Sequence, residues 1–285
     1  MAMPSRAGAN PFSVGDPDET VTRIVRFLRT HSERIGARHL VLGMSGGLDS
    51  SVTAALCSKA MGGQRTLGFC LPEAETRSRK SVQDAQEVAR KFGIRFKTLD
   101  ITSLVQAALT LLHASKMKYN VVAHGNVKSR LRAMILYYYA NTSKGLVVGT
   151  GDKSEIMLGY FTKYGDGACD IQPIADLYKS AVRDLARHLE LPRRIFSKPS
   201  SPELWPGQIA EDELGLEYSK LDLILWRLER WMPPQEIGDE LGIPRRTVEK
   251  VRIRWLKSEH KRRPPLSIKL GFRTAGQDLR IPYSL

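Results

Sequence analysis

The chain reads HLVLGMSGGLDSS from residue 39 to residue 51, which is an apolar run, a glycine-rich turn and a helix-like start. The apolar part predicts a strand over residues 38–43, and the next stretch predicts a helix over residues 51–61. A strand that turns into a helix through Ser45, Gly46 and Gly47 offers free N–H groups, hydroxyls and a positive helix end to an anion. Asp49 adds a hard oxygen ligand for Mg²⁺. This segment is therefore predicted to bind a pyrophosphate group.

The loop lacks the lysine of the pattern G-x-x-x-x-G-K-[ST], which argues against a kinase or GTPase loop. Its pattern S-G-G-x-D-S resembles the signature of the N-type ATP pyrophosphatases. That resemblance implies cleavage of ATP between its α and β phosphates and transfer of AMP to a carboxylate or carbonyl oxygen. The alternative is a plain Gly-Gly turn between strand and helix, which leaves both serines and the aspartate without a role.

Strands and helices alternate along most of the chain. The amphipathic spacing of Val21, Ile24, Val25 and Leu28 predicts a first helix. Later strands are predicted over residues 65–71, 94–99 and 145–148, and later helices over residues 76–92, 101–114, 127–141, 218–231, 234–241 and 245–259. This alternation favours an α/β fold with a doubly wound parallel sheet and C-terminal helical additions. Ligands bind at the carboxyl ends of the strands of such sheets, where the loops at Ser45 and Thr150 are expected.

The expected organisation is one main domain. Residues 1–18 are predicted to be a flexible N-terminal segment, and residues 19–285 one domain with a helical part at about 216–263 and a basic tail at 264–285. The stretch 199–215 is rich in proline and glycine and is predicted to be a long functional loop.

Composition sets the class of protein and its surroundings. The chain has 285 residues, and 44 Lys and Arg against 30 Asp and Glu give a net charge of +14, which attracts polyanions. Three scattered cysteines suit a reducing compartment and neither a disulfide framework nor a zinc site. No apolar run approaches the roughly 20 residues that span a bilayer. We therefore expect a cytoplasmic protein that does not cross a membrane.

A second polar segment, GTGDKSE at residues 149–155, again joins a strand end to a helix. Thr150 can donate a hydrogen bond to a nucleotide, and Glu155 can supply a second carboxylate to a metal ion. A glutamate in the first turn of a helix is also a common partner of the helix dipole, so both interpretations of Glu155 stay open on this segment alone.

The stretch GYFTKYGDGACD at residues 159–170 decides between these two interpretations of Glu155. Together with NVKSR at 126–130, LWPGQ at 204–208 and HKR at 260–262, it resembles the NAD⁺ synthetase family from about residue 20 to residue 282. The resemblance implies that ATP adenylates the nicotinic acid carboxylate of deamido-NAD⁺ and releases pyrophosphate. Ammonia then displaces AMP in the last step of NAD⁺ synthesis.

The family's site residues carry over to matching positions of this chain. The resemblance implies an ATP site made of Gly43, Met44, Ser45, Gly46, Gly47, Leu48, Asp49, Ser50, Thr150, Lys179 and Ser200. It implies a deamido-NAD⁺ site made of Arg130, Lys163, Asp170, His260 and Lys261. Asp49 and Glu155 would bind Mg²⁺, and Asp49 and Lys179 would be the catalytic residues. Without the resemblance, Lys163 and Asp170 would more often form a surface salt bridge than hold a ligand.

The resemblance also implies partners. Family members are homodimers, and the predicted helix pair at 101–141 is a candidate interface. Ammonia would arrive free or from a separate glutaminase.

The chain departs from the family pattern in the loop that is expected to close over the reacting groups. Ile209 and Ala210 stand where the family usually has Thr-Asp. Either Glu211 and Asp212 supply the missing polar groups, or the loop closes less tightly and excludes water less well.

Two alternatives belong to other classes. Residues 235–248, QEIGDELGIPRRTV, have the spacing of a DNA-binding helix-turn-helix followed by basic residues. The NAD⁺ synthetase family, however, carries helices here that lead into His260 and Lys261, so we expect no binding to nucleic acid. A tRNA-thiolating or GMP-forming ATP pyrophosphatase would share the Ser45 loop but not the stretch 163–170, and the chain has no cysteine pair suited to sulfur transfer.

Overall fold

Four parallel strands form the centre of the molecule. The computed structural model describes residues 15–76, 78–113, 118–275 and 278–279. Strands β1 (His39–Gly43), β2 (Thr66–Cys70), β3 (Arg95–Thr98) and β4 (Gly145–Val147) make one sheet with the order β3-β2-β1-β4, and every neighbouring pair is parallel. The four predicted strands are confirmed.

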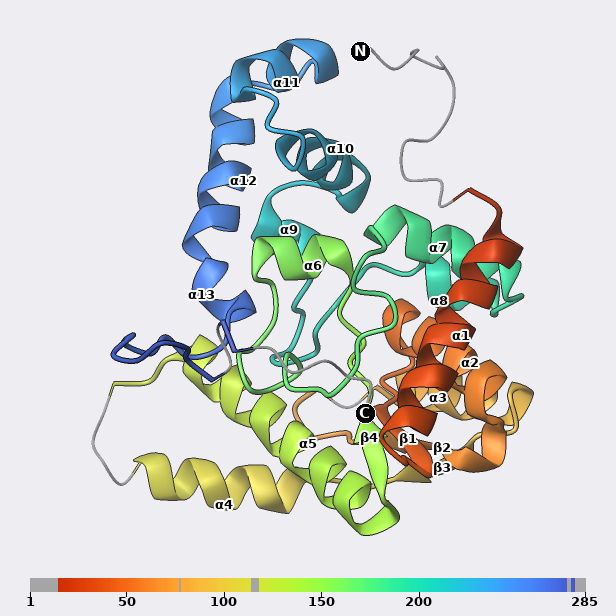
Figure 1. Cartoon of the computed structure of the whole chain (residues 1–285). Helices are drawn as coiled ribbons and strands as arrows, with labels where there is room; N and C mark the ends of the chain where they lie inside the picture. The colour runs from red at the N-terminus through yellow and green to blue at the C-terminus, as the bar shows by residue number, and fades with distance from the viewer. Residues whose placement is uncertain (1–14, 77, 114–117, 276–277, 280–285) are drawn as a thin grey trace.

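Helices cover both faces of this sheet (Figure 1). Leu40 and Leu42 of β1 belong to one buried apolar cluster, and Val41 between them belongs to another, because successive side chains of a strand point to opposite faces. The first cluster includes residues of α1 (Pro17–Arg34), α2 (Leu48–Met61), α3 (Arg79–Lys91) and α7 (Lys179–His188); the second includes residues of α4 (Thr102–His113) and α5 (Val121–Ser143). The doubly wound α/β fold is therefore confirmed.

The strand order creates a crevice. From β1 the chain proceeds through β2 to β3 on one side, whereas β4 pairs with β1 on the other side. The segments that leave the carboxyl ends of β1 and β4 therefore diverge, and a ligand can enter between them. The loops at Ser45 and Thr150 follow these two strands.

Two helices begin earlier than the sequence predicted. Helix α2 starts at Leu48, so Asp49 and Ser50 lie in its first turn. Helix α5 starts at Val121, where the side chain of Asn120 accepts a hydrogen bond from the backbone N–H of Ala123 at 2.9 Å. Gly125 lowers the helix propensity of this stretch. A Cβ at Gly125 would lie 3.0 Å from the Cβ of Leu204, so the glycine allows the 199–209 loop to pack on the helix.

The remaining helices are short or belong to the C-terminal part of the chain. They are η1 (Gly63–Arg65), α6 (Lys153–Leu158), α8 (Arg193–Ser197), α9 (Ala210–Leu214), α10 (Tyr218–Leu228), α11 (Pro234–Leu241), α12 (Arg245–Lys257) and α13 (Glu259–Arg262). The predicted C-terminal helices correspond to α10, α11 and α12, and their apolar residues join the same core as β1 and α2. Helices η1, α7, α8, α9 and α13 had no predicted counterpart.

The ends of the chain are only partly described. Most of the N-terminal segment predicted to be flexible, residues 1–14, lies outside the described residues. The side chain of Asp16 already caps helix α1 by accepting a hydrogen bond from Asp18 N. The described part of the tail, residues 264–275 and 278–279, forms no helix or regular strand. Among the described helices, none is long and apolar enough to cross a membrane.

Candidate functional site

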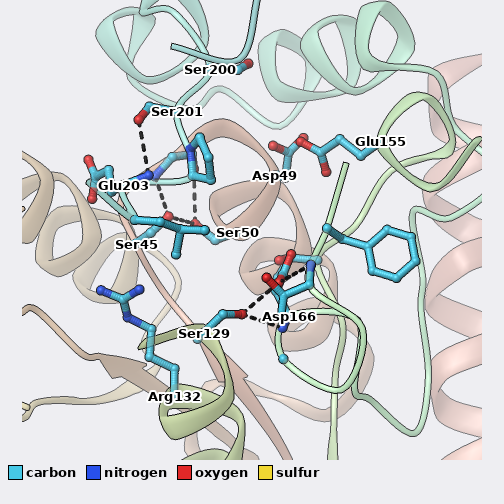
Figure 2. Close-up of a pocket in the computed structure, with 18 of the residues that line it drawn as sticks. Ser45, Asp49, Ser50, Ser129, Arg132, Glu155, Asp166, Ser200, Ser201 and Glu203 are labelled. Atoms are coloured by element: carbon cyan, nitrogen blue, oxygen red, sulfur yellow. Dashed lines mark hydrogen bonds between the residues drawn. The ribbon is translucent and has the colours of Figure 1, made fainter. Parts of the chain in front are cut away.

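A cavity of about 630 Å³ lies at the crevice between β1 and β4 (Figure 2). Its lining includes most of the residues that the sequence assigned to ATP: Gly43, Met44, Ser45, Gly47, Leu48, Asp49, Ser50, Thr150 and Ser200. Gly46 stands between Ser45 and Gly47 in the chain, and Lys179 Nζ donates a hydrogen bond to Asp49 Oδ2 beside the cavity. Segments that are more than 150 residues apart in the sequence therefore meet in one place.

The loop after β1 presents an open helix end to this cavity. Ser45 Oγ accepts a hydrogen bond from Gly47 N at 3.2 Å and lies 3.1 Å from Ser50 Oγ. None of the described side chains caps the N-terminus of α2, so its first N–H groups remain available to an anion. Gly46 has a φ of +76°, and a Cβ there would lie 2.1 Å from the backbone oxygen of Ser81. Only glycine therefore lets this loop pack against α3.

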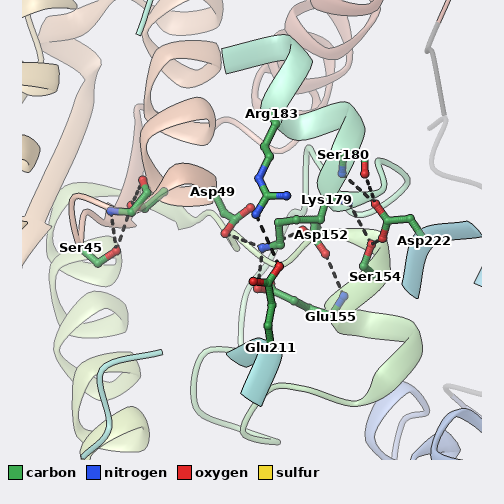
Figure 3. Close-up of polar contacts among 12 residues, drawn as sticks. Ser45, Asp49, Asp152, Ser154, Glu155, Lys179, Ser180, Arg183, Glu211 and Asp222 are labelled. Carbon is green, nitrogen blue, oxygen red and sulfur yellow. Dashed lines mark hydrogen bonds and ion pairs between the residues drawn. The ribbon is translucent and has the colours of Figure 1, made fainter. Parts of the chain in front are cut away.

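A buried lysine lies beside this helix end (Figure 3). The Nζ atom of Lys179 is 2.8 Å from Asp49 Oδ2, 2.8 Å from Asp152 Oδ2 and 2.7 Å from Glu155 Oε1. The side chains of Lys179 and Asp152 are fully buried, and those of Asp49 and Glu155 are 20% exposed. We call these four residues the Lys179 cluster.

The cluster shifts the proton affinities of its own members. Burial raises the pKa of Asp152 to about 7 against the opposing effect of Lys179, and burial also raises the pKa of Glu155 well above its ordinary value. Burial by itself would lower the pKa of Lys179, but the three carboxylates outweigh it and raise that pKa well above the usual range. Lys179 is therefore a buried ammonium group.

The Lys179 cluster suits a divalent cation. Asp49, Asp152 and Glu155 each offer a carboxylate oxygen, and these atoms lie within 4.8 Å of one another. When ionised, three carboxylates outnumber the one ammonium, and hard oxygen ligands are those that Mg²⁺ prefers. In the described part of the chain, the buried Oδ1 atom of Asp49 has no hydrogen-bond partner. An unsatisfied buried oxygen of this kind is a natural ligand for a cation.

Asp152 is the member of this cluster that the sequence analysis missed. Its side chain caps α6 by accepting a hydrogen bond from Glu155 N at 2.8 Å. An aspartate three residues before a glutamate at a helix start was the available signal, because it resembles a capping box.

Four of the five residues assigned to deamido-NAD⁺ lie next to one another in the structure. Arg130 Nη2 donates to the backbone oxygen of Lys163 at 3.3 Å, and Lys163 Nζ donates to the backbone oxygen of His260 at 2.6 Å. Lys261 Nζ donates to the backbone oxygens of Gly159 and Phe161, both at 2.7 Å, and Lys261 also lines the cavity. The structure thus brings Arg130, Lys163, His260 and Lys261 together from distant segments, and Lys261 joins this group, which we call the cationic rim, to the cavity.

Asp170, the fifth of these residues, has a different environment. Its Oδ2 atom accepts a hydrogen bond from Val147 N at 2.7 Å, and its Oδ1 atom accepts one from Tyr137 Oη at 3.2 Å. Within the described residues it forms no ion pair with Lys163, so the salt bridge considered from the sequence is not present. The carboxylate of Asp170 fixes the end of β4.

Several cavity residues were not predicted (Figure 2). Arg132 Nε donates to the backbone oxygen of Leu71 at 3.1 Å, and Ser129 Oγ donates to Asp166 Oδ1 at 2.8 Å. Glu203 Oε1 accepts a hydrogen bond from Ser81 Oγ at 3.0 Å. Arg132 lies two residues after the quoted motif 126–130, which was the only signal for it.

The 199–209 loop is packed more closely than its sequence suggested. Ala210 is buried and lines the cavity, and its N–H donates to the backbone oxygen of Ser200 at 2.9 Å. Glu211 does not replace the missing polar groups, because its Oε1 atom accepts a hydrogen bond from Tyr218 N at 3.0 Å and faces Arg183. Glu213 is the carboxylate of α9 that lines the cavity.

Helices α11 and α12 do form a tight helix-turn-helix pair. Gly242 has a φ of +63°, and a Cβ at Gly238 would lie 2.7 Å from the backbone oxygen of Ile243. The apolar side chains Ile237, Val248 and Val251 face the main core, and α13 follows with His260 and Lys261. The pair therefore supports the rim of the cavity.

Comparison with known proteins agrees with this geometry. The family model described as NAD synthase matches residues 20–265. An NH₃-dependent NAD⁺ synthetase of Aeropyrum pernix is 46% identical over 250 residues, which are 87% of each chain. The structure of NMN synthetase from Francisella tularensis superposes with a TM-score of 0.78 and 32% identity, over 90% of this chain and 100% of that one. The structure of the NH₃-dependent NAD synthetase of Campylobacter jejuni, in complex with a nitrate ion, superposes with a TM-score of 0.74 and 26% identity, again over 90% of this chain and 100% of that one.

Proposed function

We propose, because this chain belongs to the NAD synthase family, that it is an ammonia-dependent NAD⁺ synthetase. It transfers AMP from ATP to the nicotinic acid carboxylate of deamido-NAD⁺ with release of pyrophosphate, and ammonia then replaces AMP. The observation that carries the proposal is the open end of α2 beside the buried Lys179 cluster, in one cavity. Such a site neutralises a polyphosphate on one side and orients it on the other.

The residues of the Ser45 loop hold the ATP phosphates. Backbone N–H groups at the start of α2 and the hydroxyls of Ser45 and Ser50 donate to phosphate oxygens, and Thr150 and Ser200 complete the lining. The ammonium group of Lys179 stabilises negative charge that grows on the α-phosphate of the adenylyl group during its transfer. Transfer of this kind depends on positioning and charge stabilisation and requires no protein nucleophile.

Asp49 and Glu155 would hold Mg²⁺, with Asp152 as a third carboxylate next to them. When bound, the ion supplies positive charge to the phosphates and allows a second anionic substrate to approach. The unsatisfied Oδ1 atom of Asp49 supports this assignment.

The cationic rim holds deamido-NAD⁺. Arg130, Lys163 and Lys261 face an anionic dinucleotide with three positive charges, and His260 adds a further hydrogen-bonding group. The 199–209 loop and the buried Ala210 limit the entry of water, which protects an activated carboxylate until ammonia reaches it.

The exposed face of α5 supports a homodimer. Arg130, Met134 and Tyr138 follow one another at intervals of four residues, so they lie on the same face of the helix. Met134 is 53% exposed and Tyr138 63% exposed, and α4 adds the exposed Leu111. A second copy would cover this apolar surface and bring its own residues close to Arg130.

The decisive experiment measures the products. With ATP, Mg²⁺ and deamido-NAD⁺, the enzyme should form NAD⁺ and AMP in equal amounts with NH₄⁺ and much less NAD⁺ with glutamine alone. Nicotinic acid mononucleotide should be compared as a substrate, because one similar structure is an NMN synthetase. A higher kcat/KM for the mononucleotide, or no NAD⁺ with either nitrogen source, would contradict the proposal.

The carboxylates of the Lys179 cluster provide the second prediction. Asp49→Asn and Glu155→Gln should each slow single-turnover AMP release by about 100-fold or more, because a hard cation loses a charged ligand. Asp176→Asn is the control, since that carboxylate is 96% exposed and pairs with Lys153 outside the cavity. Near-parental rates in both variants at saturating Mg²⁺ would disprove the metal assignment.

The rim provides the third prediction. Arg130→Gln and Lys163→Gln should raise the KM of deamido-NAD⁺ about tenfold and leave the KM of ATP within twofold, because a lost ground-state contact affects the ligand it touched. Arg245→Gln changes an exposed arginine on α12 and should alter neither value. Equal increases in both KM values would argue against a separate dinucleotide site.

The exposed face of α5 provides the fourth prediction. Sedimentation analysis of the parent should give twice the mass of one chain, whereas Met134→Lys with Tyr138→Glu should favour single chains, because burying the new charges in an interface is costly. Ile253→Lys places a charge on an exposed apolar residue of α12 and should leave the dimer intact. A parent that sediments as a fully active single chain would remove the interface from the proposal.

A further inference from the structure

A further buried carboxylate lies behind the three of the Lys179 cluster. Asp222 of α10 is fully buried. Its Oδ1 atom accepts a hydrogen bond from Ser154 Oγ at 2.5 Å, and its Oδ2 atom accepts hydrogen bonds from Ser180 N at 2.8 Å and Ser180 Oγ at 2.6 Å (Figure 3). One side chain of α10 thus binds both α6 and α7.

The two serines that Asp222 binds are sequence neighbours of residues in the Lys179 cluster. Ser154 precedes Glu155 in α6, and Ser180 follows Lys179 in α7. Ser154 Oγ also accepts a hydrogen bond from Lys179 N at 3.0 Å. A displacement of either helix would therefore break a hydrogen bond of this network and separate Lys179 from Glu155.

The same helix contacts the lysine directly. Tyr218, one turn before Asp222, is fully buried and places the face of its ring 5.0 Å from Lys179 Nζ. Burying a carboxylate is costly unless donors satisfy it, and Asp222 has three. A fully satisfied buried network of this kind holds its members in one arrangement.

We propose that Asp222 is a positioning residue for the reaction. By binding Ser154 and Ser180, it fixes the ammonium of Lys179 and the carboxylate of Glu155 in the relative placement that ATP requires. Asp222 acts through these neighbours and touches no reacting atom. The inference rests on the proposed function, which assigns Lys179 and Glu155 to ATP.

The test compares Asp222→Ala, Asp222→Asn and Ser180→Ala with the parent. Asp222→Ala should lower kcat by about 10- to 100-fold, the range expected for a residue that orients a ligand, and leave the KM of deamido-NAD⁺ within twofold. It should also weaken the binding of ATP with Mg²⁺ in calorimetry by about tenfold or more. Asp222→Asn should keep most of the parental kcat and of the parental affinity for ATP with Mg²⁺, because the amide can accept a hydrogen bond from Ser180 N and donate one to Ser154 Oγ. Ser180→Ala should lower kcat and ATP affinity as well, but less than Asp222→Ala does.

Leu221→Ala is the matched control. Leu221 is a buried core residue of the same helix, so its loss should lower the melting temperature and leave kcat and ATP binding within twofold of the parent. Parental kcat and ATP binding in a folded Asp222→Ala would overturn the proposal, as would an equal loss of kcat in Leu221→Ala.

Two further results separate the possible failures. If Asp222→Ala does not fold, unchanged kcat and ATP binding in Ser180→Ala would overturn the positioning role. If the parent forms no NAD⁺, the proposed function fails, while calorimetry with ATP and Mg²⁺ still decides whether Asp222 positions the site.

Discussion

The ammonium group of Lys179 has left water completely and lies between three carboxylates at 2.7–2.8 Å. Transfer of such ions into a protein interior costs several kcal/mol each, and only close, well-placed partners offset that cost. The partners come from α2, which follows β1, and from the start of α6, which follows β4, whereas the lysine begins α7. The ion cluster is therefore favourable only when both halves of the crevice are in place. Removal of one partner of a buried ion pair costs about 3–5 kcal/mol.

The cavity combines two opposite electrostatic features. The open end of α2 attracts an anion, and the Lys179 cluster beside it has three carboxyl groups against one ammonium. A polyphosphate placed against the helix end is repelled by the carboxylates unless a cation lies between them. The strand order β3-β2-β1-β4 is what brings the two features together, because only neighbouring strands with diverging connections leave room for a ligand at their ends.

Local sequence patterns could predict much of this arrangement. The Ser45 loop was identifiable because its open helix end is built from residues that are adjacent in the chain, and Gly46 is required there by one close backbone contact. Asp222 was not identifiable in that way, and the capping-box pattern marks Asp152 only as a helix cap, since each acquires its place near Lys179 from helices that are distant in the sequence. Helix α5 was predicted too short because Gly125 weakens the local signal, and the reason for that glycine, the packing of Leu204, appears only in three dimensions.

The C-terminal helices are better regarded as part of the site than as additions to it. Helix α10 contributes Tyr218 and Asp222 beside Lys179, and α13 brings Lys261 to the rim through hydrogen bonds to Gly159 and Phe161. The apolar residues of α10, α11 and α12 belong to the core that also covers β1. Because polar contacts and packing both extend from these helices to the strands, the geometry of the cavity depends on the fold of the chain from β1 to α13. The proposed nucleotide site cannot be transferred as the Ser45 loop alone, since the loop would supply the anion contacts and the distant helices fix the charges opposite them.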